Sequence, residues 1–176
     1  MEPGQNVMKS DGITAAPDAV QITLRDVCDE DREFLLSVYE AGRETELAMV
    51  PWDAAQRRAF VEHQFDAQDM HYRTYYEGST HEIILFDGVP AGRLYLNRAD
   101  QIAILDIAVL PEFRNRGIGT ALIRRLKDEA ATSGRVLRIY IESFNPSQKL
   151  FTDLGFAVVE DDGVMRQFVW SMAHRA

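Results

Sequence analysis

The sequence predicts one α/β domain with a mixed central sheet of about six to seven strands and about four helices. Three patterns carry this prediction. Residues 102–141 follow the order buried strand, helix and strand, which is typical of a right-handed βαβ unit with parallel strands. Turn residues at Asp87-Gly88 and around Asp161-Asp162-Gly163 predict hairpins, which add antiparallel neighbours. Amphipathic periodicity predicts helices over 29–43 and 53–76.

Composition restricts the class of protein. The chain has 176 residues, of which 46% are hydrophobic, enough to bury the core of one domain. The net charge of −9 argues against nucleic acid and membranes as partners, because an acidic surface repels phosphates and anionic lipid. Cys28 is the only cysteine, so no internal disulfide can form and a cysteine-based metal site would lack ligands. The four histidines show no metal-ligand spacing either, so no metal is expected. The chain has no apolar run near the roughly 18 residues of a membrane span and no secretory signal, so a cytoplasmic location is expected.

The N-terminal part predicts helices after a single strand. Residues 1–18 are polar and aperiodic, which predicts a disordered leader before one domain at 19–176. The expected elements are then a strand at 20–25, a helix at 29–43, a linker or short helical turn at 44–51, and a helix from the N-cap Asp53 to about Tyr76.

The C-terminal part predicts strands around one long helix. The strand at 102–110 is apolar on both faces except at Asp106, which predicts a central strand covered on both sides. Pro111 ends this strand. The other expected elements are strands at 82–86, 91–96 and 136–141, helices at 117–131 and 146–154, and a hairpin of 157–160 with 165–172.

One segment between the central strand and the long helix carries specific chemistry. Gly117 and Gly119 remove Cβ atoms where a bulky anion would approach the main chain. The N–H groups of a first helical turn lack partners within the helix and would point at that anion. Arg114 and Arg116 add positive charge. The segment predicts a pyrophosphate-binding anion cradle, formed by Arg114, Asn115, Arg116, Gly117, Ile118, Gly119 and Thr120.

Two other phosphate-binding motifs fit less well. The P-loop string Gly-x-x-x-x-Gly-Lys-Ser/Thr does not occur in the sequence. A dinucleotide-binding Gly-x-Gly-x-x-Gly would need a glycine where Leu122 stands, although Glu142 could replace the ribose-binding acid. That motif usually opens a repeated βαβ domain, and this sequence predicts only one such unit. A dinucleotide-dependent oxidoreductase therefore stays open as a lesser alternative.

Two motifs resemble those of the GCN5-related N-acetyltransferases, the GNAT superfamily. Arg114-x-x-Gly117-x-Gly119 is similar to the family signature Gln/Arg-x-x-Gly-x-Gly/Ala and follows a comparable strand. Residues 145–156, which end in Leu-Gly-Phe, resemble the family's second cofactor motif. The resemblance implies the GNAT fold, in which acetyl-CoA lies in a V-shaped cleft that splits the sheet, here between strands 104–109 and 136–142.

The resemblance also implies roles for residues along that cleft. The pantetheine arm would pair with the main chain of Ile107, Ala108 and Val109, and the N–H of Val109 would stabilise the oxyanion. Asn145 would contact the cofactor arm, although capping the next helix is an equally good role. Phe151 aligns with a cofactor-site tyrosine that protonates the departing thiolate in many members, so this role is vacant and the reaction is expected to be slower without it.

Direct transfer to an amine needs a base, because a lysine-like amine has a pKa of about 10.4. Asp106 is the first candidate, with its pKa raised by burial. The competing interpretation is that Asp106 is tied to Arg93 or Arg138. Glu142, at the mouth of the cleft, is the second candidate.

The acceptor site of this family is usually shaped by its two N-terminal helices. Glu44 and Glu46 lie between these helices in the sequence and are a third option for the base. Together with Trp52 and Tyr95 they are candidates for binding a cationic amine by charge and cation–π contact. A solvated linker explains the two glutamates equally well.

These features, with the resemblance, predict an acyl-CoA-dependent N-acyltransferase that uses acetyl-CoA and no metal. The amine would attack directly in a ternary complex. A non-enzymatic acyl-CoA-binding module on the same fold is the alternative. The sequence does not identify the acceptor, and a homodimer is left open.

Overall fold

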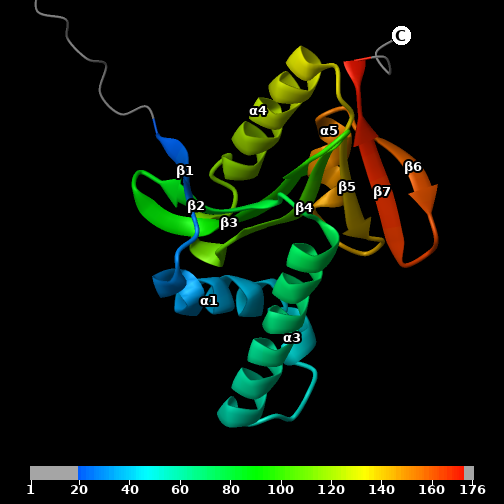
Figure 1. Cartoon of the computed structure of the whole chain (residues 1–176). Coiled ribbons are helices and arrows are strands. Elements are labelled where there is room, and N and C mark those ends of the chain that lie inside the picture. Colours follow the sequence, from blue (N-terminus) through cyan, green and yellow to red (C-terminus); the bar gives the residue numbers. More distant parts are fainter. Residues whose placement is uncertain (1–19, 173–176) are drawn as a thin grey trace, which may run out of the picture.

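A computed structural model describes residues 20–172 as a seven-stranded mixed sheet with helices on both faces (Figure 1). The strand order is β1-β2-β3-β4-β5-β7-β6. The strands are β1 (Ile22–Asp26), β2 (Thr80–Phe86), β3 (Val89–Arg98), β4 (Ile102–Val109), β5 (Leu137–Glu142), β6 (Ala157–Asp161) and β7 (Met165–Trp170). The helices are α1 (Arg32–Gly42), α2 (Glu44–Leu47), α3 (Ala54–Tyr75), α4 (Ile118–Ser133) and α5 (Gln148–Asp153), with 3-10 helices η1 (Asp29–Asp31) and η2 (Pro111–Phe113). The leader expected at 1–18 lies outside the described residues.

Local side-chain bonds fix the helix starts near the N-terminus. The helix expected from residue 29 begins as the 3-10 turn η1, where the Asp31 carboxylate accepts from the Cys28 amide (2.9 Å) and from Arg25 (2.6 Å). The Arg25 guanidinium holds the pKa of Asp31 well below its ordinary value. Asp53 caps α3 as predicted, because its carboxylate accepts from the Gln56 amide at 2.8 Å. The choice left open at 44–51 resolves as a short helix, α2.

Two apolar clusters hold the layers together on opposite faces of the sheet. Helices α4 and α5 pack on one face, and α1 and α3 pack on the other (Figure 1). Adjacent residues of β2 show the alternation, since Ile84 belongs to the first cluster and Ile83 to the second. The central sheet therefore has α4 and α5 on one face and α1 and α3 on the other.

The sheet splits between β4 and β5. These strands pair in parallel only from Ile102↔Leu137 to Ile104↔Ile139, although both continue beyond that point. A bulge accompanies the split, because Tyr95 pairs with Asp106 and Leu96 with Ile104, which leaves Leu105 unpaired. The expected coverage of both faces of β4 is accordingly wrong for its second half: residues 105–109 are only half-buried.

The bulge is held from the helical layer. The hydroxyl of Tyr72, on α3, donates to the Leu105 carbonyl at 2.9 Å. Burial raises the pKa of Tyr72, which keeps the phenol protonated and able to donate. Helix α3 thus fixes the point at which β4 turns away from β5.

Candidate active site

The anion cradle has the main-chain geometry of a helix N-terminus with free donors. Asn115 and Gly117 adopt positive φ (59° and 78°), and Gly117 caps α4 without a side-chain hydrogen bond. The first helical amide to find a partner is that of Ala121, which donates to the Gly117 carbonyl at 3.0 Å. Among residues 20–172, no acceptor takes the amides of residues 116–120. These donors can therefore bind a phosphate group.

Gly119 lies where two helices pack closely. A Cβ built on Gly119 would lie 3.1 Å from Cδ2 of Leu150, a side chain of α5. The glycine lets α5 pack closely against the first turn of α4. This packing brings residues 145–156, which resemble the family's second cofactor motif, against the anion cradle.

The two arginines of the cradle point elsewhere than expected. Arg114 donates through Nε to the Val109 carbonyl (3.0 Å) and through Nη2 to the Ala41 carbonyl (3.3 Å). The Arg116 guanidinium lies over the rings of Phe86 (5.5 Å) and Phe113 (5.7 Å). Arg114 thus ties β4 to α1 with donors that were expected to face the anion. The hydrogen bond from Arg114 to Ala41 could not be predicted from the sequence, because the two residues lie 73 positions apart.

The open edge of β4 presents main-chain groups to the split. The Leu110 amide donates to the Ala91 carbonyl of β3 (2.9 Å), and alternate residues of a strand point their N–H groups to opposite edges. The amide of Val109 therefore faces away from β3, toward the split. Ile107, Ala108 and Val109 are half-buried there, as a wall for an extended ligand would be.

Asp106 lies in an ion pair. The Nε of Arg93 donates to its Oδ2 at 2.6 Å, and the side chain of Arg93 is 3% exposed while that of Asp106 is 23% exposed. Burial alone would lower the pKa of Arg93, but the charge of Asp106 raises it, so the guanidinium stays charged. Of the two arginines considered as partners of Asp106, the structure pairs it with Arg93 and not with Arg138. The carboxylate of Asp106 is partly exposed.

Glu142 and Asn145 lie at the other wall of the split. The Glu142 carbonyl accepts from the Asn145 amide (3.0 Å) and from Nε2 of Gln148 (2.9 Å), which closes the turn between β5 and α5. The Asn145 side chain accepts from the Ser147 amide at 2.9 Å. This bond closes the turn before α5, whose N-cap residue is Ser147, so Asn145 is not the cap of that helix.

Two residues predicted to touch ligands lie in the core. Phe151 is 1% exposed and packs edge-on against Phe156 at 5.2 Å between ring centroids. Tyr95 is also 1% exposed and stacks on His81 at 3.9 Å. Both positions follow from packing, because the inward faces of α5 and β3 bury these rings. In this structure neither side chain is open to the cleft, so the assignments of Phe151 to the cofactor and Tyr95 to the acceptor are corrected.

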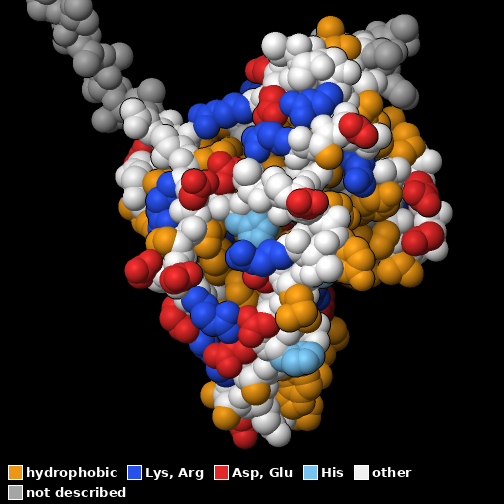
Figure 2. All heavy atoms as spheres, viewed as in Figure 1, with side chains coloured by type: hydrophobic (Ala, Val, Ile, Leu, Met, Phe, Trp, Pro, Cys, Tyr) orange, Lys and Arg blue, Asp and Glu red, His pale blue; other side chains and the backbone are white. Residues whose placement is uncertain are grey.

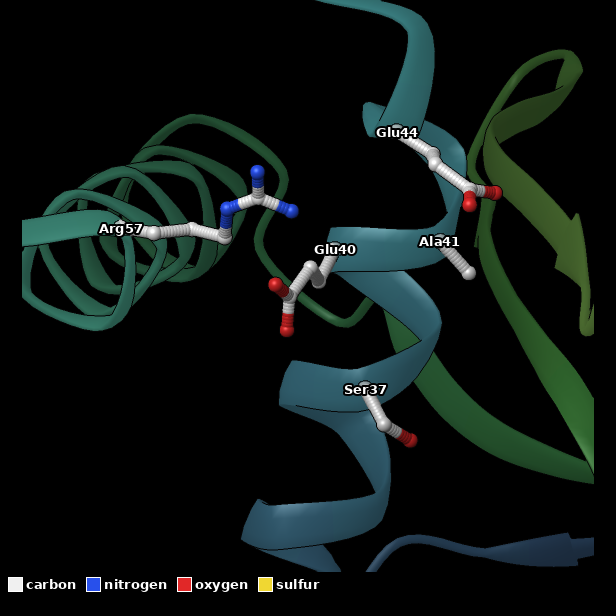
Figure 3. Close-up of a pocket in the computed structure, with 5 residues that line it drawn as sticks. All are labelled: Ser37, Glu40, Ala41, Glu44 and Arg57. Atoms are coloured by element: carbon white, nitrogen blue, oxygen red, sulfur yellow. The ribbon is translucent and has the colours of Figure 1, made fainter. Parts of the chain in front are cut away.

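A hollow of about 250 Å³ lies among the N-terminal helices (Figure 3). We name it the charged hollow, lined by Ser37, Glu40, Ala41, Glu44 and Arg57. Of the candidate acceptor residues, Glu44 alone lines it. Sequence reasoning missed Glu40 and Arg57, since each lies on a helix that reads as an ordinary amphipathic segment.

The other candidate acceptor residues are engaged outside the charged hollow. Glu46 pairs with Arg43 at 3.0 Å, one turn along the chain. Trp52 packs on Phe60 with 4.9 Å between ring centroids. These contacts are those of a local ion pair and a local aromatic pair.

The charged hollow lies next to the open edge of β4. Ala41 lines the hollow, and its carbonyl shares the Arg114 guanidinium with the carbonyl of Val109. A single side chain therefore spans the distance between the two. Anion cradle, open strand edge and charged hollow form one continuous region.

The surface around this region carries charges of both signs. Figure 2 shows acidic and basic side chains interspersed over the N-terminal helices, and apolar side chains gathered over the strands at the C-terminal end of the sheet. The exposed apolar residues there include Tyr140, Phe144, Val158, Val159 and Val164. No helix within residues 20–172 is long and apolar enough to cross a bilayer. The same residues hold no group of three His, Cys, Asp or Glu side chains that could bind a metal.

Comparison with known proteins identifies the family. The sequence matches the model of the Acetyltransferase (GNAT) family over residues 39–156, so the chain belongs to this family. The resemblance predicted from the two motifs is confirmed, and so is the predicted fold class. A search of curated proteins gave no match.

Solved structures show the same fold. The PaiA N-acetyltransferase from Thermoplasma acidophilum, in complex with coenzyme A, is 18% identical over 86% of this chain and 99% of that chain, with a TM-score of 0.65. A GCN5-related N-acetyltransferase from Rhodopseudomonas palustris is 21% identical over 96% of this chain and 100% of that chain, with a TM-score of 0.60. A GNAT family acetyltransferase from Elizabethkingia anophelis with acetyl-CoA bound is 16% identical over 86% of this chain and 98% of that chain, with a TM-score of 0.55.

Proposed function

We propose that this chain is an N-acyltransferase that transfers acetyl from acetyl-CoA to a primary amine by direct attack in a ternary complex. One observation supports this above the others. The unpartnered amides of the anion cradle, the open edge of β4 and the charged hollow adjoin one another in a single region. Structures of two similar folds hold coenzyme A or acetyl-CoA, which agrees with the proposal.

The residues present fit such a cosubstrate. The amides of residues 116–120 would bind its pyrophosphate, and the free edge of Ile107, Ala108 and Val109 would pair with its amide chain like an added strand. The cosubstrate supplies an activated acyl group. The Val109 amide would donate to the carbonyl oxygen as negative charge develops there. Asn145 closes the turn beside this path.

A carboxylate near the open edge would take the amine proton. Asp106 is our first choice, with Arg93 fixing the carboxylate through Oδ2. Glu142 on the opposite wall is the alternative. Protonation of the departing thiolate falls to water or to the amine proton, because Phe151 has no proton to give.

Mass spectrometry of the native protein and a thiol-release assay across an amine library test the proposal. We expect retained coenzyme A and thiol release that depends on an amine. Retained coenzyme A without turnover on any amine would instead establish a binding module. A bound dinucleotide in its place would favour the oxidoreductase. A dimer, with the exposed apolar side chains of the C-terminal strands as its contact, is a separate proposal for sedimentation analysis.

Asp106→Asn tests the choice of base. We expect kcat/KM to fall about 100-fold, within the range typical of general base catalysis, and the acidic limb of its pH profile to disappear. Coenzyme A affinity should stay near that of the parent. An unchanged pH profile would move the role to Glu142, and Glu142→Gln is the matched variant.

A further inference from the structure

The charged hollow contains charged groups that the rest of the described chain leaves unpaired. Within residues 20–172, no ion-pair partner lies within 4 Å of Arg57, Glu40 or Glu44. The neighbouring Arg58 shows the usual behaviour of an arginine on this helix, since it binds Glu33 and Glu62. Arg57 is half-buried as well. An arginine without a carboxylate partner is available to bind an anion from solution.

These charges are laid out in an order. In Figure 3, Ala41 and Glu44 lie on the side of the hollow nearer the strands, Glu40 lies between, and Arg57 reaches in from the opposite side, from α3. The Ala41 end adjoins Val109 through the guanidinium of Arg114. Negative charge is thus found nearest the open edge of β4, and positive charge lies farther away.

We propose that the acceptor is a small amino acid-like molecule, with a primary amine and a carboxylate a few bonds apart. This inference rests on the proposed function. The ammonium group would bind toward Glu44 and Glu40, beside the open edge of β4, and the carboxylate would bind Arg57. An arginine and a carboxylate can form two parallel hydrogen bonds, which fixes orientation as well as position. The hollow of about 250 Å³ falls below the roughly 300–1,000 Å³ of sites for drug-sized ligands, which favours a small acceptor.

The test uses matched acceptors. Each amino acid of a broad set is assayed beside its carboxamide and its decarboxylated amine, with acetyl-CoA as donor and thiol release as the readout. We expect at least one amino acid to exceed its two analogues tenfold or more in kcat/KM. Arg57→Gln should remove that preference by lowering only the value for the amino acid. Arg58→Gln, on the same helix but paired away from the hollow, should leave the preference intact.

Charge reversal gives a positive signal. Arg57→Glu should turn the preference toward diamines, because the carboxylate-binding end becomes an ammonium-binding end. Coenzyme A affinity of every variant, which depends on the main-chain amides of the anion cradle and not on Arg57, verifies that each one is folded.

The outcomes separate the two proposals. Thiol release without a carboxylate preference, or a preference that survives in Arg57→Gln, would overturn this inference and leave the N-acyltransferase standing. Retained coenzyme A with no release on any amine would overturn the proposed function and this inference with it.

Discussion

The anion cradle and the charged hollow adjoin each other, yet they are built by different means. The cradle is one continuous segment, and its donors are main-chain amides fixed by the start of α4. The hollow draws Ser37, Glu40, Glu44 and Arg57 from three helices, and its chemistry lies in side-chain charge. Binding at the cradle is therefore expected to depend on the space that its glycines leave free. Binding at the hollow is expected to depend on the charges of its side chains.

This difference bears on which ligand each region is suited to bind. Amides bind any suitably placed phosphate, so the cradle suits a cosubstrate shared by a whole family. Side chains change singly without altering the main chain, so the charges of the hollow, our proposed acceptor site, can change while the fold persists. The predictions below test the comparison, beginning with the main chain.

The largest effect is expected at Gly92, which pairs with Val109 across β3 and β4. A Cβ at this position would overlap the carbonyl oxygen of Ala108, a main-chain atom that cannot rotate away. We expect Gly92→Ala to lower the free energy of unfolding by about 3 kcal/mol, at the upper end for overpacking, as measured by urea denaturation. Gly42→Ala, where an added Cβ meets nothing within 4 Å, is the control. Equal stability of the two variants would contradict the close approach of β3 and β4.

The next effect concerns binding at the cradle. Gly119→Glu places bulk and negative charge among the free amides, so coenzyme A affinity should fall at least tenfold, or about 1.4 kcal/mol, in calorimetric titration. Circular dichroism should show the parent fold. Gly119→Ala, which needs only a small movement of the Leu150 side chain, should bind more tightly than the glutamate variant. Full affinity in folded Gly119→Glu would remove the cradle as the cofactor site.

A smaller effect sharpens the boundary between the two regions. Arg114 binds the carbonyls of both Val109 and Ala41, so it couples the strand edge to the hollow. In Arg114→Gln the amides of the cradle remain, and coenzyme A affinity should change less than about threefold because hydrogen bonds to main-chain atoms elsewhere are lost. The acceptor kcat/KM should fall by roughly three- to tenfold, since the hollow is no longer held beside Val109. A larger loss of coenzyme A affinity than of acceptor kcat/KM would place Arg114 in the cradle after all.

The smallest effect on activity at neutral pH is expected for a substitution of Tyr95, which belongs to neither the cradle nor the hollow. Tyr95→Phe should leave acceptor KM unchanged in steady-state assays, because the ring is buried. Burial raises the pKa of Tyr95 to about 12, against about 10 in an unfolded chain. The unfolded state therefore loses this proton first as pH rises, and the stability due to the neutral phenol falls between pH 10 and 12 by about 1.4 kcal/mol per unit. Denaturation at pH 8 and pH 11 should show a smaller alkaline loss in Tyr95→Phe, and an altered acceptor KM would restore Tyr95 to the acceptor site.

Much of the fold was predictable because its signals are local. The Asp87-Gly88 turn, the Asp53 cap and the glycines after β4 each act within a few residues, and each marks an element boundary near its observed place. The resemblance to the family's strand implied a bulge near this segment, but its position at Leu105 depends on the register with β3 and on a hydrogen bond from Tyr72, which the sequence does not show. The apolar pattern of 102–110 predicted burial along the whole strand, whereas the resemblance placed the cleft along 104–109. The second half of β4 does border the split.

The sequence by itself determined the family and the main-chain half of the site, because the cradle motif and the strand before it are contiguous. Only the tertiary structure decided which side chains face the site. It turned Arg114 toward Ala41, paired Asp106 with Arg93, and buried Phe151 and Tyr95. It also brought Arg57 and Glu40 to one hollow from separate helices. The direction of a side chain depends on partners far along the chain, and the register and helix packing that supply them are properties of the folded molecule.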